Sequence, residues 1–187
     1  MNRRYIWFAV TMAVAAALST HIIAAEQPTK LFQKRDVGAV SGPIIGPGTV
    51  IGPGTIISSD AVIGSGVVIG SEVVIGSGVV IGSEVVIGPG VRISSGVVID
   101  SKAVIEQNVN VGSGVTIGQV AVIGHGSIIE QGVVIEHRAV IGHGSIIEQR
   151  AVIGTGANIA PGTRIKQDEV IGPGSIINSG VVVCNNN

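Results

Sequence analysis

Residues 63–81 read IGSGVVIGSEVVIGSGVVI, and the six-residue period of this stretch decides the fold. The same period continues without a break from Ile45 to Val183, which makes 24 hexads. The first residue of every hexad is Ile, except at Val111 and Val183. Nearly all of the 29 glycines lie one or three places after that aliphatic residue. So regular a pattern indicates one structural unit repeated along the chain.

Each hexad predicts a short strand followed by a corner. The segment Val67-Val68-Ile69 is β-branched and therefore suits a strand. Strand alternation points Val67 and Ile69 to one side and Val68 to the other. The glycines between strands accept positive φ angles at little steric cost, and Pro-Gly pairs favour a tight turn.

The longest internal match gives the number of corners in a circuit. The segment AVIGHGSIIEQ occupies residues 121–131 and recurs at residues 139–149, so position 121 maps onto position 139. Three hexads therefore make one coil, and 24 hexads make eight coils whose strands stack in parallel at roughly 4.8 Å. We predict an all-β fold, a triangular parallel β-helix of eight 18-residue coils with no inserted loop.

The N-terminal segment predicts export. Residues 1–25 have a basic start at Arg3 and Arg4, an apolar run and small residues before Glu26, as in a signal peptide. An uncleaved membrane anchor is the alternative, because the apolar run is about long enough to cross a bilayer. We predict a periplasmic, secreted or cell-surface location. The predicted divisions are a signal peptide (1–25), a linker and lead-in (26–44), the β-helix (45–184) and an Asn tail (185–187).

Composition excludes several classes of function. The formal net charge is −1, which argues against a nucleic-acid partner. Aromatic residues make up 2% of the chain, so the rings that stack on sugars or single-stranded bases are scarce. Cys184 is the single cysteine and cannot form a disulfide within the chain.

The repeat is similar to that of the hexapeptide-repeat superfamily, whose members form left-handed parallel β-helices. The resemblance covers residues 45–183 and implies the left hand, which the six-residue period alone does not determine. It is specific for the fold but not for the activity, because one scaffold can carry unrelated functions.

Two enzymatic alternatives follow from this resemblance. Hexapeptide acyltransferases use a histidine base with an acyl donor such as acetyl-CoA bound between subunits, which makes His125 and His143 the candidates. The γ-class carbonic anhydrases hold zinc by histidines in a segment that Gly124–Glu130 resembles. Glu130 and Glu148 stand where the second histidine of that segment belongs. The alternative metal set is therefore His125, Glu130, His143 and Glu148.

Neither alternative is the main prediction, because 24 uninterrupted hexads offer no loop to build a water-excluding pocket. We expect no cofactor, no metal and no catalytic residue, with the histidines as solvated corner residues. The alternative remains a trimeric hexapeptide enzyme with an acetyl-CoA or zinc site.

The outward strand position favours self-association instead. It is apolar along two faces of the predicted column, and a soluble monomer rarely exposes large contiguous apolar patches. We predict a homo-oligomer, a trimer by the resemblance, and a non-enzymatic structural or interaction role through these faces. The predicted interface residues are Val62, Val80, Val98, Val134 and Val152 on one face and Val68, Val86, Val104, Val122 and Val140 on the next.

Overall fold

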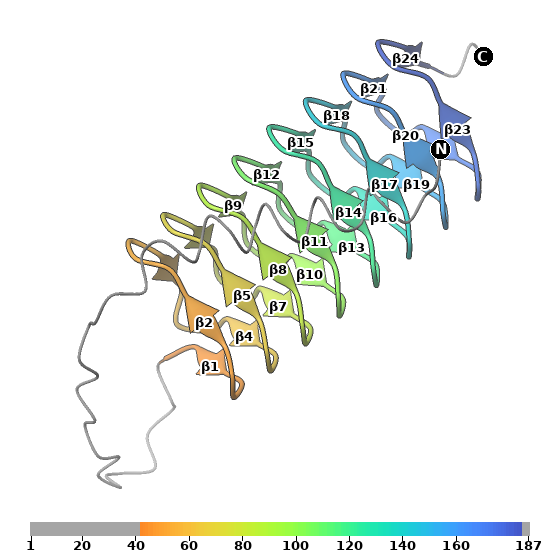
Figure 1. Cartoon of the computed structure of the whole chain (residues 1–187). Helices are drawn as coiled ribbons and strands as arrows, with labels where there is room; N and C mark the ends of the chain where they lie inside the picture. The colour runs from red at the N-terminus through yellow and green to blue at the C-terminus, as the bar shows by residue number, and fades with distance from the viewer. Residues whose placement is uncertain (1–41, 185–187) are drawn as a thin grey trace, which may run out of the picture. The chain divides into compact units, whose positions relative to one another are not determined.

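The computed structural model describes residues 42–184, which form a column of 24 two-residue strands in three parallel sheets (Figure 1). The signal peptide, most of the lead-in and the Asn tail predicted above lie outside the described residues. In the described part no helix is long and apolar enough to cross a membrane.

We name the three sheets by their strands. Sheet A contains β1 (Ile44–Ile45), β4 (Val62–Ile63), β7 (Val80–Ile81), β10 (Val98–Ile99), β13 (Thr116–Ile117), β16 (Val134–Ile135), β19 (Val152–Ile153) and β22 (Val170–Ile171). Sheet B contains β2 (Val50–Ile51), β5 (Val68–Ile69), β8 (Val86–Ile87), β11 (Val104–Ile105), β14 (Val122–Ile123), β17 (Val140–Ile141), β20 (Asn158–Ile159) and β23 (Ile176–Ile177). Sheet C contains β3 (Ile56–Ile57), β6 (Val74–Ile75), β9 (Arg92–Ile93), β12 (Asn110–Val111), β15 (Ile128–Ile129), β18 (Ile146–Ile147), β21 (Arg164–Ile165) and β24 (Val182–Val183).

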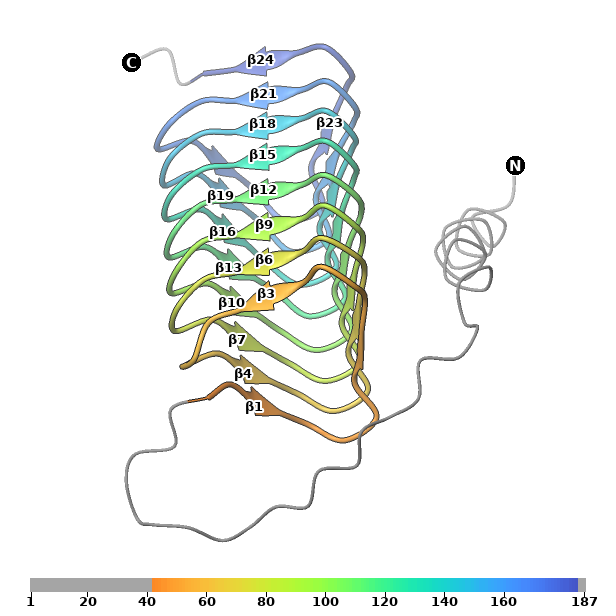
Figure 2. The same ribbon diagram turned by 90° about the vertical axis from the view of Figure 1, so that its left-hand side faces the viewer.

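Every strand pairs with the strand three places along the chain. In sheet A, for example, Val98 is the partner of Thr116 and Ile99 is the partner of Ile117, which lie one full coil apart. Figure 2 looks onto sheet C, where the strands from β3 to β24 form one stack. The prediction of an all-β, left-handed parallel β-helix with eight coils is confirmed.

The interior of the column is a stack of Ile residues with small partners. Residues such as Ile69, Ile123 and Ile159 have no exposed surface, and burying one such side chain contributes roughly 1.5–3 kcal/mol. Three of the four buried polar residues, Ser127, Ser145 and Thr163, are short and hydrogen-bonded, as where the Ser127 hydroxyl donates to the Gly142 carbonyl at 3.1 Å; the fourth is Glu169. The core therefore extends along almost the whole column.

The corners separate the sheets, and we name the three rows of corners edge A/B, edge B/C and edge C/A. At the first corner place glycine allows close stacking: a Cβ added to Gly124 would lie 2.5 Å from the His143 backbone nitrogen. The third corner place has a left-handed backbone, for example φ 66° at Gly126. Eight residues other than glycine adopt that conformation: Glu72, Glu84, Lys102, Asn108, Val120, Arg138, Arg150 and Asp168.

Two sets of backbone hydrogen bonds join each coil to the next. The N–H groups of outward strand residues and first corner residues donate to carbonyls of the following coil, as from Gly124 to Ile141 at 2.7 Å. The N–H of the third corner residue donates to a carbonyl of the preceding coil, as from Gly144 to His125 at 2.9 Å. The N–H of the second corner residue takes no part in this ladder, so proline is accepted there.

Candidate functional site

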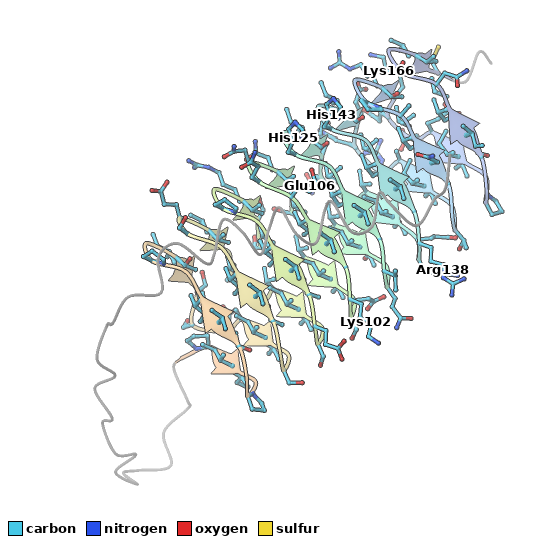
Figure 3. The ribbon with its side chains drawn as sticks, viewed as in Figure 1. Lys102, Glu106, His125, Arg138, His143 and Lys166 are labelled. Carbon is cyan, nitrogen blue, oxygen red and sulfur yellow. The ribbon has the colours of Figure 1, made fainter. Side chains whose placement is uncertain are left out.

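The structure divides the histidines between two edges. His125 and His143 lie on edge B/C in successive coils, with parallel rings whose centroids are 4.8 Å apart (Figure 3). His137 belongs to edge A/B, because it follows β16 of sheet A. The two histidines predicted as alternative catalytic residues are therefore neighbours, and the third is remote from them along the circuit.

His125 forms a pair with a carboxylate from the coil below it. Its Nδ1 lies 3.3 Å from Oε2 of Glu106, and the same oxygen accepts the His125 backbone N–H at 2.9 Å. The two contacts hold the carboxylate beside the ring. The His125 side chain is 52% exposed and the Glu106 side chain 24% exposed. Within residues 42–184, Nε2 of His125 has no hydrogen-bond partner.

This arrangement has the geometry of an oriented general base. A carboxylate bonded to Nδ1 fixes the orientation and tautomer of the ring and leaves Nε2 as the nitrogen that takes a proton. Sequence reasoning missed Glu106, although the stacking of coils brings it next to His125. The signal was a carboxylate at the first corner place of one coil, followed by a histidine at the second corner place of the next coil on the same edge.

The same relation between coils recurs at edge A/B. Glu136 Oε2 accepts hydrogen bonds from the Thr155 hydroxyl at 2.7 Å and from the Thr155 backbone N–H at 2.8 Å. These bonds, and after them the charge of His137, hold the pKa of Glu136 below its usual value against the opposing effect of burial. The Thr155 hydroxyl oxygen lies 3.2 Å from Nδ1 of His137. A glutamate at the first corner place thus holds the next coil's backbone in place.

The structure does not bring the predicted metal set together on one column. Glu130 and Glu148 follow strands of sheet C and lie on edge C/A, whereas His125 and His143 lie on edge B/C. Across residues 42–184 there is no group of three or more His, Cys, Asp or Glu residues that could hold a metal ion. One hexad turns the chain from one edge to the next, so residues five places apart are carried to different edges.

Glu148 has its own partners on edge C/A. Its Oε1 lies 2.8 Å from Nε of Arg164 and 3.2 Å from Nζ of Lys166, and its Oε2 accepts the Gln167 backbone N–H at 3.2 Å. Burial of the Glu148 carboxyl raises its pKa, but these bonds and the two positive charges outweigh that effect and lower the pKa overall. Glu148 therefore acts as an acceptor that ties neighbouring coils together.

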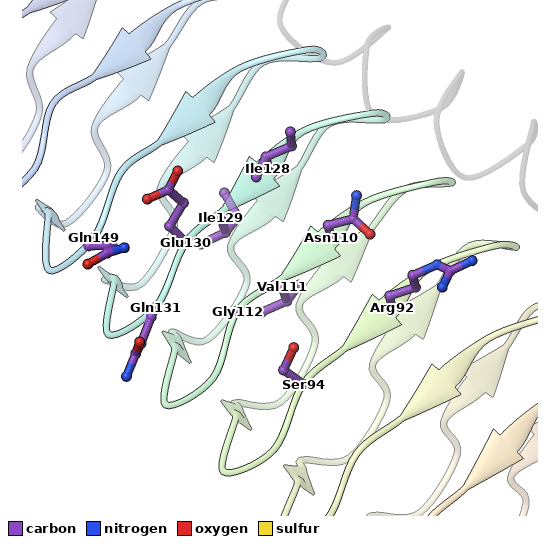
Figure 4. A pocket seen from close by; sticks show the side chains of 10 residues that line it. All are labelled: Arg92, Ser94, Asn110, Val111, Gly112, Ile128, Ile129, Glu130, Gln131 and Gln149. Atoms are coloured by element: carbon purple, nitrogen blue, oxygen red, sulfur yellow. The ribbon is translucent and has the colours of Figure 1, made fainter.

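A shallow groove lies on the outer surface of sheet C. Its volume is about 430 Å³, and it runs across β9, β12 and β15 to edge C/A (Figure 4). Asn110 and Gly112 form its floor because they are smaller than the residues above and below them. The groove is open, so it is not the water-excluding pocket that the sequence analysis expects to be absent. The residues that line it are Arg92, Ser94, Asn110, Val111, Gly112, Ile128, Ile129, Glu130, Gln131 and Gln149.

The predicted interface residues form two straight rows. The register aligns the valines of sheet A in one row and those of sheet B in another. In sheet A, Val62, Val80, Val98 and Val134 are exposed and Val152 is half-buried. Of the five predicted interface residues in sheet B, Val140 alone is exposed, and Val68, Val86, Val104 and Val122 are half-buried. Both rows remain unpartnered in a single column.

The family comparison agrees with the repeat. The family model described as bacterial transferase hexapeptide (six repeats) matches residues 42–77 and 66–101. Among curated proteins no relative matches the chain.

Solved structures with this architecture are similar over about two thirds of the chain. One is a proposed acetyltransferase from Bacillus cereus, with 28% identity over 69% of this chain and 77% of that one, and a TM-score of 0.43. Another is a UDP-N-acetylglucosamine acyltransferase from Bacteroides fragilis 9343, with 22% identity over 68% of this chain and 54% of that one, and a TM-score of 0.44. A third is a perosamine N-acetyltransferase variant from Caulobacter crescentus, in complex with CoA and GDP-perosamine, with 19% identity over 63% of this chain and 50% of that one, and a TM-score of 0.33. The chain thus spans little more than half the length of the last two, and with TM-scores below 0.5 none of them assigns an activity to it.

The predicted periplasmic, secreted or cell-surface location is wrong in the light of these matches. The matching structures are described as acyltransferases and acetyltransferases, and none of them is described as an exported protein. The prediction came from residues 1–25, which lie outside the described residues. The uninterrupted hexads and the three-sided coil agree with the hexapeptide repeats that the family model matches over residues 42–101, and they support a similarity to the hexapeptide-repeat superfamily of left-handed parallel β-helices.

Proposed function

We propose that the chain is a hexapeptide-repeat acyltransferase that acts as a homo-oligomer, with His125 as its general base. The observation that carries this proposal is the His125–Glu106 pair, in which the carboxylate lies at Nδ1 and Nε2 has no hydrogen-bond partner within residues 42–184. The family model supports the reaction class, because its description is that of a transferase. This proposal takes the enzymatic alternative in place of the non-enzymatic role predicted from the sequence.

The pair can perform the proton transfers of acyl transfer. Nε2 of His125 takes the proton of an acceptor hydroxyl or amine while the oxygen or nitrogen of that acceptor attacks the thioester carbonyl of acetyl-CoA. The tetrahedral intermediate then breaks its carbon–sulfur bond, and the proton on Nε2 passes to the leaving thiolate, which gives the acylated acceptor and free CoA. Glu106 is a positioning residue that holds the Nδ1–H during both transfers.

A second copy of the chain is needed to enclose this site. On one column His125 is half-exposed on an open edge, and the sheet C groove does not include it. The sheet B valine row borders edge B/C, so a column packed on that row also covers the flank of His125. Sheet A of a neighbouring copy offers a matching apolar row.

The two rows differ, so the contact between copies is heterologous. A row from sheet A against a row from sheet B leaves each copy with one row free for a further copy. Repeating this contact around a three-fold axis closes a ring, and each interface then carries one His125. We therefore propose a trimer with an acyl-donor cleft between neighbouring columns.

The test is a thiol-release assay on the purified full chain. It uses acetyl-CoA with a panel of amino and hydroxyl acceptors, and it follows the free thiol of CoA. His125→Asn is expected to lower kcat by about 10²- to 10⁴-fold, the usual contribution of a general base. Glu106→Gln is expected to lower kcat less and to change the pH profile of kcat, because it changes what Nδ1 can bond.

His137→Asn is the matched control, because it is also a corner histidine beside a glutamate but lies on edge A/B. Its rate should equal that of the unchanged chain. Equal rates for His125→Asn and His137→Asn would refute the assignment of the base. Separately, Val122→Asp should separate columns that pack side by side, so that particles in electron micrographs are one column wide, and columns still packed side by side would contradict the heterologous interface.

A further inference from the structure

The two ends of the column expose residues that are buried in every inner coil. In the first coil (β1 to β3) Ile45 is 43% exposed and Ile51 is 40% exposed. In the last coil (β22 to β24) Val181 is 40% exposed. The corresponding residues of the inner coils are fully buried or nearly so, such as Ile63, Ile69 and Val73 at 2% or less. Both ends therefore present open core.

The unpaired backbone groups at the two ends are complementary. In the last coil the N–H groups of outward and first corner residues, such as Val170 and Gly172, have no acceptor within residues 42–184. In the first coil the carbonyls of Ile45 and Thr49 have no donor within the same range. The strand groups thus leave donors on the last coil and acceptors on the first, and the third corner places add the reverse pairing, with the same triangular outline at both ends.

The register of these groups continues from one end to the other. The column consists of whole coils, so a second copy placed on the last coil can extend the ladder without a shift. Four N–H groups of the last coil would donate to carbonyls of the second copy's first coil: Gly172 to Ile45, Ile176 to Thr49, Asn178 to Ile51 and Val182 to Thr55. In the reverse direction, two N–H groups of the second copy's first coil would donate to carbonyls of the last coil: Gly48 to Pro173 and Gly54 to Ser179.

The usual protections of an open sheet edge are sparse at both ends. Charged residues commonly prevent edge-to-edge pairing, yet the last coil contains only Glu169, whose side chain is buried before β22, and residues 44–61 contain only Asp60. The prolines of these coils stand at the second corner place, whose N–H the ladder does not use. Gly172 also leaves room above it, since an added Cβ would meet only the Ser175 hydroxyl at 3.6 Å.

The chain enters and leaves the column at the same edge. Pro43 precedes β1 of sheet A, and Val183 ends β24 of sheet C, so both connections lie on edge C/A. No connecting chain from residues 42–184 crosses the other two edges or the three strands at either end of the column.

We propose that the last coil of one copy stacks on the first coil of another, so that columns join end to end into rods. The occupant of each end is a second copy of this chain, because the pattern of donors, acceptors and apolar residues at one end repeats the pattern that the other end requires. Such a head-to-tail contact does not close on itself, so growth is open-ended. Each added copy lengthens the rod by roughly 38 Å, from eight coils at about 4.8 Å.

The experiment uses two full-length variants that each block one end. Val181→Asp puts a charge into the last coil, and Ile51→Asp puts one into the first, at positions that stacking would bury. The unchanged chain is expected to form rods that lengthen with concentration in electron micrographs and in sedimentation. Each variant alone should remain one column long, and an equimolar mixture should form joined pairs and nothing longer, because each variant retains one intact end.

The mixture still tests the proposal if a substitution unfolds the coil that carries it. The pair forms between the unchanged first coil of the Val181→Asp variant and the unchanged last coil of the Ile51→Asp variant. Asn110→Asp, a charge at mid-column on sheet C and outside both valine rows, is the control and should leave rod growth unchanged. The proposal is overturned by an unchanged chain that stays one column long at every concentration, whatever covers its ends. Growth of either variant alone, or a mixture without pairs, overturns it too. Acetyl-CoA turnover is a separate readout, so failure here leaves the catalytic proposal to its own test.

Discussion

Replacing glycine by alanine at the first corner place should destabilise the chain where another coil lies above that glycine, and should have little effect in the last coil. Gly70 and Gly172 occupy the same place, and neither has a left-handed backbone. A Cβ at position 70 would lie 2.6 Å from the Pro89 nitrogen and 2.8 Å from the Gly88 carbonyl carbon, both of them backbone atoms. A Cβ at position 172 would meet only a side-chain hydroxyl at 3.6 Å. The two glycines therefore differ only in what covers them.

The expected cost of Gly70→Ala is about 1–3 kcal/mol in the free energy of unfolding, the range for overpacking a well-packed site. The cost stays in this range because first corner places such as Glu106 and Ala160 already hold side chains, so neighbouring coils can move apart locally. Gly172→Ala should change the free energy by less than about 0.5 kcal/mol, or stabilise slightly by restricting the unfolded chain.

The measurement is urea unfolding of the full chain followed by circular dichroism, at a concentration where a single species is present. Gly114→Ala separates the effect of backbone angle from that of close approach, because Gly114 has φ 66° and open space around a Cβ. It should cost about 1–2 kcal/mol through left-handed strain alone. Equal stability losses for Gly70→Ala and Gly172→Ala would refute the close-approach argument.

Three further substitutions test other features of the column. Val120 is a β-branched residue at φ 61°, so Val120→Gly should stabilise the chain by about 0.5–1 kcal/mol in urea unfolding, the strain relieved less the backbone entropy of glycine. Hydrogen bonds from Arg150 and Gln167 lower the pKa of Asp168 from 3.8 to about 2. The stability that these bonds contribute is therefore present above about pH 4 and is lost as the pH falls through 2. Arg150→Ala should raise the pKa of Asp168 in an NMR titration and remove the part of the acid dependence that comes from Arg150. Thr163→Val removes a buried hydroxyl that donates to two corner carbonyls at 2.7 and 3.1 Å, and thermal unfolding should report a loss of about 0.5–1.5 kcal/mol.

The sequence alone determined the architecture, because every hexad repeats the same pattern of a buried residue, a strand and a corner. The Ile at its first place must be buried, the strand before it is β-branched, and the corner after it needs glycine or a residue that tolerates a left-handed backbone. Once residues 121–131 recur at 139–149, the length of the coil follows, and with it the partner of every strand. The two valine rows follow from the same register.

Contacts between corner side chains depended on the tertiary structure. Reasoning along the chain grouped His125 with Glu130, five places away, but the turn of one hexad carries Glu130 to edge C/A. The carboxylate that reaches His125 belongs to Glu106, whose side chain extends toward the coil above and accepts that coil's backbone N–H. Repeat length predicts which corners stack, but only the side-chain conformation decides which of the stacked groups bond.

The groove on sheet C and the state of the two ends were likewise decided in three dimensions. The groove exists because small residues of one coil lie between larger residues of its neighbours, a relation among stacked positions that no local pattern expresses. The ends matter because each coil donates from its strands to the following coil and from its third corner places to the preceding coil, and only the hydrogen bonds of the assembled column show which groups each end leaves unpaired. Local chemistry thus determines the coil, and the stacking of coils determines what their edges and ends can bind.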